Sequence, residues 1–413
     1  MSIVTMLKKR EALLFPVFDI FMNLLNYFFH IVNSWFLSKG DYGKLNALLG
    51  LSAILIVAGI SLQIYTAKTI ALSSEKDSIV IGKALKFALF SNIVITLFFI
   101  IASGKIMELT STELSSYILL AAIFIFNTFL CVLRGIFQGK KQFLRLNASL
   151  YIEVSVKIAV LFILIVNFKS IDSAMAAILA GMAVSTLHGV ILLFTRLKEA
   201  EPIKEMITLK EALSVTAIYG SNFFIYFFTS VDLIMANYIL KIDSGEYSVI
   251  IRYSQLITFA FSSLLTVFLP GMASAIKENN SLKRRLLRYT IVISGFYFLV
   301  ILAYWVVLPV TVEYMFGSQY NGSSNYLLLG ALVYIPLSMI FFLININIVL
   351  DTKKYIITLF IVAILVVFVL LNSERTISSF LKNEAVLYWS AALVLGVHTL
   401  LEVKRYEYRK NNS

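Results

Sequence analysis

The chain has 413 residues, of which 60% are hydrophobic and only 14% charged, whereas soluble domains carry about 25% charged residues. This composition excludes a soluble catalytic domain, and the net charge of +12 does not indicate a nucleic-acid binder because the Lys and Arg residues lie in short segments between apolar runs. One cysteine, Cys131, and three histidines without a second ligand at metal-binding spacing predict neither a disulfide nor a metal or cofactor site.

Apolar runs of about 20 residues predict membrane-spanning helices. With the N-terminus on the cytoplasmic side, the segments on that side hold 26 Lys and Arg and the outer loops hold 7. This bias predicts an even number of spans and two cytoplasmic termini. The twelve predicted spans are about 12–37, 45–66, 86–105, 115–136, 146–168, 173–195, 212–240, 247–270, 288–309, 325–348, 354–372 and 384–401.

Two short motifs indicate an internal duplication. Residues 40–43 read Gly-Asp-Tyr-Gly and residues 245–248 read Gly-Glu-Tyr-Ser, and each motif lies between one long span and the next. We therefore predict an all-α membrane protein with a six-helix bundle over 1–195, a cytoplasmic linker over 196–212 and a second six-helix bundle over 213–413. Because six spans return the chain to the same side, the bundles are expected to be related by a pseudo-two-fold axis along the membrane normal, as in transporters that work by alternating access.

Span one carries a polar stripe. Asp19, Asn23, Asn26, His30 and Asn33 follow one another at spacings of 4, 3, 4 and 3, so they share one face of the helix. The stripe has two interpretations, since it fits the wall of a transport cavity or a set of hydrogen bonds between neighbouring helices. Its length over about four turns favours the cavity.

Ionisable residues inside later spans are costly unless they face a bundle interior. Glu153 and Lys157 of span five are either a self-neutralising pair or a cation presented to an anionic ligand. Asp232 and Arg252 of spans seven and eight either pair with each other, or Arg252 faces the cavity and Asp232 holds it. The predicted cavity residues are Asp19, Asn23, Asn26, His30, Asn33, Glu153, Lys157, Asn222, Asp232, Arg252 and Gln255.

Motifs of ATP-driven pumps and of hydrolases are missing from the sequence. Residues 135–141, Gly-Ile-Phe-Gln-Gly-Lys-Lys, fail the spacing of a phosphate-binding loop, and there is no G-x-S-x-G or H-E-x-x-H. We therefore expect no enzyme activity, and the energy for transport would come from an ion gradient, the membrane potential or the substrate's own concentration difference.

Four stretches, in chain order, resemble the Wzx-type polysaccharide flippases of the multidrug, oligosaccharidyl-lipid and polysaccharide (MOP) exporter superfamily. They are residues 40–43, 134–139 with Phe143 following, 231–234 with 245–247 following, and 316–320. The resemblance implies two six-helix bundles in the bacterial cytoplasmic membrane. It also implies that an undecaprenyl-pyrophosphate-linked oligosaccharide is exported from the inner to the outer leaflet, with H+ or Na+ as a coupling ion, membrane lipids around the chain and a polysaccharide polymerase as a partner.

Two other functions stay open. A cation-coupled drug or metabolite antiporter of the same superfamily would use Asp19 as its proton or sodium site. A glycan-polymerising enzyme would need a long outer loop with catalytic charges, and the longest outer segment, residues 309–325, has only Glu313 as a charged residue. The buried cations and the Asn-rich face of span one favour the oligosaccharide-lipid flippase.

Overall fold

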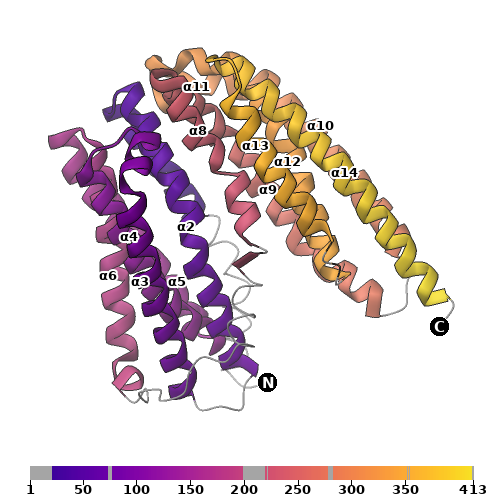
Figure 1. Cartoon of the computed structure of the whole chain (residues 1–413), viewed down its shortest axis with the longest axis horizontal. Coiled ribbons are helices and arrows are strands. Elements are labelled where there is room, and N and C mark those ends of the chain that lie inside the picture. Colours follow the sequence, from indigo (N-terminus) through magenta and orange to yellow (C-terminus); the bar gives the residue numbers. More distant parts are fainter. Residues whose placement is uncertain are drawn as a thin grey trace. The chain divides into compact units, whose positions relative to one another are not determined.

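The computed structural model describes residues 21–72, 77–198, 219–220, 222–277, 282–350, 352 and 354–411, and every regular element within them is helical (Figure 1). The chain divides into two compact units, Met1–Tyr226 and Phe227–Ser413. This division falls inside predicted span seven. Most of the predicted linker 196–212 lies outside the described residues, so its bounds stay a prediction.

The first unit contains one helix for each of the six predicted spans. The first covers residues 21–36, and Asp19 lies outside the described residues. The helices that follow are α2 (Lys39–Leu72), α3 (Asp77–Thr110), α4 (Leu114–Gly139), α5 (Phe143–Phe168) and α6 (Ile171–Lys198).

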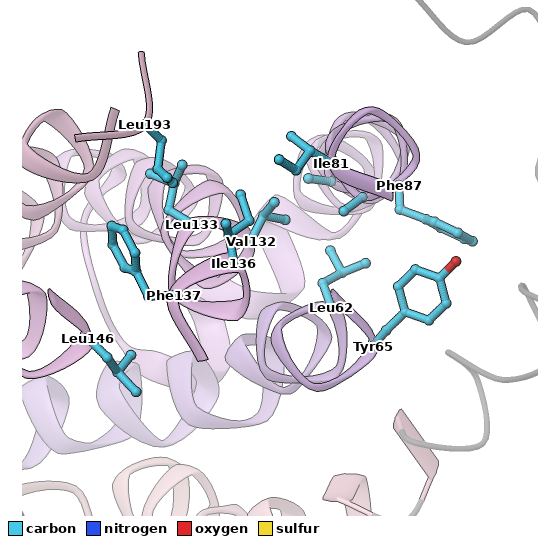
Figure 2. Packing of buried hydrophobic residues seen from close by; sticks show 12 residues of the cluster. Leu62, Tyr65, Ile81, Phe87, Val132, Leu133, Ile136, Phe137, Leu146 and Leu193 are labelled. Atoms are coloured by element: carbon cyan, nitrogen blue, oxygen red, sulfur yellow. The ribbon is translucent and has the colours of Figure 1, made fainter. Parts of the chain in front are cut away.

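Helix α4 is the centre of the first unit, since it packs against α2, α3, α5 and α6. Its side chains Val132, Ile136 and Phe137 are completely buried. Figure 2 shows them between side chains of α2, α3, α5 and α6, among them Leu62 and Leu146. A helix that is apolar on several sides is buried by its neighbours, which explains why α4 lies at the centre.

Two glycines four residues apart allow α2 and α4 to approach closely. A Cβ atom on Gly135 would lie 2.8 Å from the carbonyl oxygen of Gln63, and one on Gly139 would lie 2.8 Å from that of Ala67. Small residues at this spacing let membrane helices bring their backbones together. The Gly-Ile-Phe-Gln-Gly sequence at 135–139 is therefore a helix-packing motif.

The second unit begins with an interruption of predicted span seven. A helix over residues 222–228 ends in a turn at Thr229 and Ser230, and α8 (Val231–Leu240) starts directly after it. The remaining elements are the 3-10 turn η1 (Lys241–Asp243), α9 (Ser244–Lys277), α10 (Leu282–Leu302), the π-helical segment η2 (Ala303–Val307), α11 (Leu308–Phe316), the 3-10 segment η3 (Ser318–Tyr326), α12 (Leu327–Val349), α13 (Tyr355–Leu371) and α14 (Ile377–Asn411).

Two of the stretches that carry the family resemblance meet in the second unit. Gly317 has a φ of 98°, which only glycine adopts without strain, and it turns the chain from α11 into η3. The Ser323 hydroxyl in η3 then donates to the carbonyl oxygen of Glu246 in the first turn of α9 at 3.2 Å. Residues 316–320 and 245–247 therefore belong to one packed end of this unit.

Helix lengths fit a membrane protein. Nine helical stretches within the described ranges are long and apolar enough to cross a membrane, and α13 adds a shorter apolar helix of 17 residues. Spans seven and eight count as the single stretch Asn222–Leu265, and only part of span one is described. Each of the twelve predicted spans overlaps a helix, so the expected all-α multi-pass fold is confirmed.

The close contact of α2 with α4 predicts that Gly135→Leu destabilises the protein. The added side chain would meet backbone atoms of α2, and such overpacking costs about 1–3 kcal/mol. Thermal unfolding of the purified protein in detergent should show a lower melting temperature. Gly104→Leu is the matched control, because a Cβ atom at Gly104 of α3 meets open space. Equal melting temperatures for the two variants would contradict the close packing of α2 and α4.

Candidate functional site

Lys157 lies buried in the middle of α5, with 8% of its surface exposed. Its Nζ atom donates a hydrogen bond to Oδ1 of Asn26 in the first helix, and lies 4.8 Å from the ring centroid of Phe29. The amide oxygen and the face of the aromatic ring both stabilise a positive charge. Helix α5 and the first helix together therefore hold an ammonium group inside the first unit.

Glu153, one turn before Lys157, pairs with a residue of α4. Its Oε2 atom accepts a charge-assisted hydrogen bond from the Arg134 guanidinium at 2.6 Å. Arg134 also donates to the Ser149 hydroxyl at 3.1 Å and to the Ser149 carbonyl oxygen at 3.2 Å. The carboxylate of Glu153 therefore joins α5 to α4, instead of forming an isolated pair with Lys157 along α5.

Arg134, Glu153 and Lys157 form a cluster of two cations and one carboxylate, called here the basic cluster. In the part of the chain that the structure describes, no carboxylate lies within ion-pair distance of Lys157. The basic cluster thus carries an excess positive charge away from water. Cations in a low-dielectric site attract anions strongly, so the chemistry of this site favours an anionic ligand.

Helix α6 fixes the position of the basic cluster. A Cβ atom on Gly181 would lie 2.4 Å from the carbonyl oxygen of Glu153 and 3.1 Å from Cβ of Lys157. One turn later, the Ser185 hydroxyl donates to the carbonyl oxygen of Ser149 at 2.7 Å. The absence of a side chain at Gly181 therefore lets α6 touch α5 where its charged residues project.

Among the stripe residues that the structure describes, Asn26 is the hydrogen-bond partner of Lys157. Asn33 is completely buried and donates to the carbonyl oxygen of Phe29 at 2.7 Å, while Asn23 is exposed. His30 is partly buried and lies edge-on to the ring of Phe29. Asp19 lies outside the described residues. Whether the whole stripe lines a cavity stays a prediction.

A second polar cluster lies in the second unit, next to the interruption of span seven. Asp232 is in the first turn of α8, where unpaired N–H groups favour a carboxylate. It is completely buried, and its Oδ1 atom accepts the backbone N–H of Leu233 at 2.8 Å. The Tyr247 hydroxyl of α9 lies 3.2 Å from its Oδ2 atom.

The same Tyr247 hydroxyl lies 2.9 Å from Oε2 of Glu384 on α14. Glu384 is 1% exposed, and its Oε1 atom has no hydrogen-bond partner among the described residues. Two carboxyl groups therefore contact one hydroxyl, and we call Asp232, Tyr247 and Glu384 the acidic cluster. A hydroxyl has one proton, so Tyr247 can donate to only one of them, and the other contact is a hydrogen bond only if that carboxyl carries a proton.

Glu384, like Arg134 and Tyr247, was not among the predicted cavity residues. The predicted span starts at 384, whereas α14 begins at Ile377 and places Glu384 inside the helix. One turn later, the Tyr388 hydroxyl donates to the carbonyl oxygen of Phe228 at 3.0 Å and satisfies the end of the broken helix. Glu384 and Tyr388 are four residues apart, so they share one helix face, and this spacing was the signal in the sequence that could have indicated a polar site.

The other predicted residues of spans seven and eight are not members of the acidic cluster. Arg252 is 9% exposed, donates to Oε1 of Gln255 at 2.8 Å within α9, and acts electrostatically on Asp232. Asn222 is partly buried and belongs to the first unit. The structure thus brings Asn26, Glu153 and Lys157 together in the first unit, and it places Asp232 and Arg252 in the second.

Comparison with known proteins gives the family. Residues 10–276 match the family described as "Polysaccharide biosynthesis protein". The chain belongs to the polysaccharide biosynthesis protein family. A search among curated protein sequences finds no match.

Solved structures of similar architecture establish the fold of this family member. An inward-facing multidrug resistance MATE family transporter of the MOP superfamily matches with a TM-score of 0.78 and 14% identity, over 94% of this chain and 96% of that chain. A MOP superfamily transporter from Pyrococcus furiosus Vc1 matches with a TM-score of 0.67 and 14% identity, over 97% and 96%. The fold of this family member is therefore the one seen in these MOP-superfamily transporters, as the resemblance implied.

Removal of the Glu153 charge alone should destabilise the protein more than removal of both charges of its ion pair with Arg134. Glu153→Gln leaves the buried Arg134 without a carboxylate, and an uncompensated buried charge costs about 3–5 kcal/mol. The double variant Arg134→Met with Glu153→Met removes both charges and should lose less stability than Glu153→Gln. Melting temperatures in detergent test this order. A double variant less stable than Glu153→Gln would contradict the buried pairing.

Proposed function

We propose that this polysaccharide biosynthesis family member is a flippase for an undecaprenyl-pyrophosphate-linked oligosaccharide. It would move this lipid from the inner to the outer leaflet of the bacterial cytoplasmic membrane during synthesis of cell-surface polysaccharide. Both termini would be cytoplasmic, and a polysaccharide polymerase would receive the exported units. The chain would act as a transporter without catalytic activity.

The basic cluster carries this proposal. A pyrophosphate needs positive charge to cross a low-dielectric region, and Lys157 and Arg134 supply two cations against the single carboxylate of Glu153. Asn26 and Asn33 add amide groups on the adjacent helix, and amides suit the hydroxyl groups of a sugar. A cationic drug would be repelled by the same cluster, so the cluster favours the flippase over a drug antiporter.

Lys157 should be required for export. In the native host, gene deletion should remove surface polysaccharide and accumulate undecaprenyl-linked units inside the cell. A gene encoding Lys157→Ala should restore less than about a tenth of the wild-type surface polysaccharide, because loss of a buried charge partner costs at least about 2 kcal/mol. Lys157→Arg, which keeps the charge, should restore more than Lys157→Ala.

Lys169→Ala is the matched control, since Lys169 is an exposed lysine just after the end of the same helix. All variants are compared at equal membrane abundance. Full export by Lys157→Ala would remove Lys157 from the transport path. Unchanged glycan pools after gene deletion, together with new sensitivity to cationic drugs, would instead support the antiporter, with Asp19 as the next residue to test.

We also propose that a proton is the coupling ion and that the acidic cluster is its site. Both contacts of the Tyr247 hydroxyl with carboxyl oxygens are hydrogen bonds only when one of the two carboxyl groups carries a proton. Loss or uptake of that proton changes a hydrogen bond between α9 and either α8 or α14. Proton binding could therefore alter the packing of these three helices.

Glu384→Gln should uncouple export from the proton gradient. The amide imitates a protonated carboxyl and can donate to the Tyr247 oxygen, so the variant should keep its melting temperature. Export should fall towards the level that the wild type shows after a protonophore is added, and the protonophore should have no further effect on the variant. Glu374→Gln is the control, because Glu374 is exposed in the turn before α14. A protonophore response equal to that of the wild type would exclude Glu384 as the proton site.

A further inference from the structure

An apolar groove lies in the second unit between α10, α12 and α14. Its volume is about 360 Å³, and its deepest side chains, Ile293, Phe342 and Ala392, are less than 9% exposed. Apart from two hydroxyl side chains of α10, its lining is apolar. Figure 1 shows α10, α12 and α14 near one another in this unit.

The groove is elongated along α14. Its α14 lining runs from Trp389 through Ala392 and Gly396 to Leu400, which spans roughly 16 Å at the rise of an α-helix. An apolar cavity of about 150 Å³ accommodates one benzene ring, so this groove has room for about two or three five-carbon units. A chain of linked hydrocarbon units fits this shape better than a compact ligand.

The Leu400 end of the groove lies level with the start of α10. The Tyr297 hydroxyl lies 2.7 Å from that of Ser338, and the Asn347 amide donates to the Thr399 hydroxyl at 2.7 Å. These two bonds set the register of α10 and α14 against α12, so that the start of α10 lies at the Leu400 end of the groove.

One exposed basic residue belongs to that end. Lys404 continues the lining face of α14 one turn beyond Leu400. An amphipathic lipid with a hydrocarbon tail and a phosphate head matches an apolar groove that ends in positive charge.

We infer that this groove holds the polyisoprenyl tail of the lipid-linked substrate, with its phosphate at the end marked by Lys404. The inference rests on the proposed flippase function and adds a tail site in the second unit to the basic cluster of the first. The tail stays in an apolar environment, since hydrocarbon gains nothing by entering a polar cavity.

The inference is tested by measuring how much lipid is retained by variants in which a larger side chain fills the groove. The full-length protein is purified with undecaprenyl phosphate and a tenfold excess of phosphatidylglycerol, and the bound lipid is identified by native mass spectrometry. Gly396→Leu places a side chain into the groove without a clash, because a Cβ atom at Gly396 has open space around it. The variant should retain about tenfold less undecaprenyl phosphate, which corresponds to about 1.4 kcal/mol of binding free energy.

Gly295→Leu is the matched control. Gly295 is on α10, its Cβ position also has open space, and it does not line the groove. This variant should retain as much undecaprenyl phosphate as the wild type. Lys404→Gln should weaken retention of undecaprenyl phosphate but leave retention of uncharged undecaprenol unchanged.

Three results would overturn the inference. Equal retention by Gly396→Leu and the wild type would exclude the groove as the tail site and leave the flippase proposal intact. Displacement of undecaprenyl phosphate from the wild type by the excess phosphatidylglycerol would show that an ordinary bilayer lipid occupies the groove. A wild-type protein that retains no undecaprenyl phosphate would contradict both the tail site and the proposed substrate.

Discussion

Inside a bilayer there is no water to satisfy a backbone polar group, and this constraint explains the polar residues of the second unit. The interruption of span seven frees carbonyl groups at its first half and N–H groups at the start of α8. Tyr388 donates to the Phe228 carbonyl oxygen, and Asp232 accepts the N–H of Leu233. Tyr388 and Asp232 therefore satisfy backbone groups that the break in the helix leaves without an intrahelical partner. Once Asp232 is buried there, its second oxygen needs a donor, which Tyr247 supplies.

Glycines have a comparable effect in the first unit. Gly135 brings α4 against α2, and the adjacent Arg134 is directed towards α5, where it pairs with Glu153. Gly181 brings α6 against the backbone of Glu153 and the Cβ atom of Lys157. Close backbone contact without side chains in between leaves little freedom for the helices to shift. The glycines thus hold the charged groups of the basic cluster at fixed positions.

The two units share a pattern but differ in chemistry. Helices α2 and α9 both have 34 residues, and each has a completely buried tyrosine near its start, Tyr42 and Tyr247. In the second unit Tyr247 connects two carboxyl groups, whereas the first unit concentrates the cations Arg134 and Lys157. The two units therefore share part of a helix pattern while their buried polar residues differ, because packing depends on apolar periodicity and ligand binding on a few side chains.

The sequence by itself determined the twelve spans and the presence of charged residues within them, because hydrophobicity over 20 residues is a local property. It also identified Asn26, Lys157 and Asp232 as residues that need a special environment. The tertiary structure alone decided their partners: Asn26 and Lys157 are 131 residues apart, and Tyr247 and Glu384 are 137 residues apart. The break in span seven, the pairing of Glu153 with Arg134 and the groove beside α14 likewise depend on which helices pack together. Periodicity along one helix does not specify that choice, since any apolar face fits several neighbours.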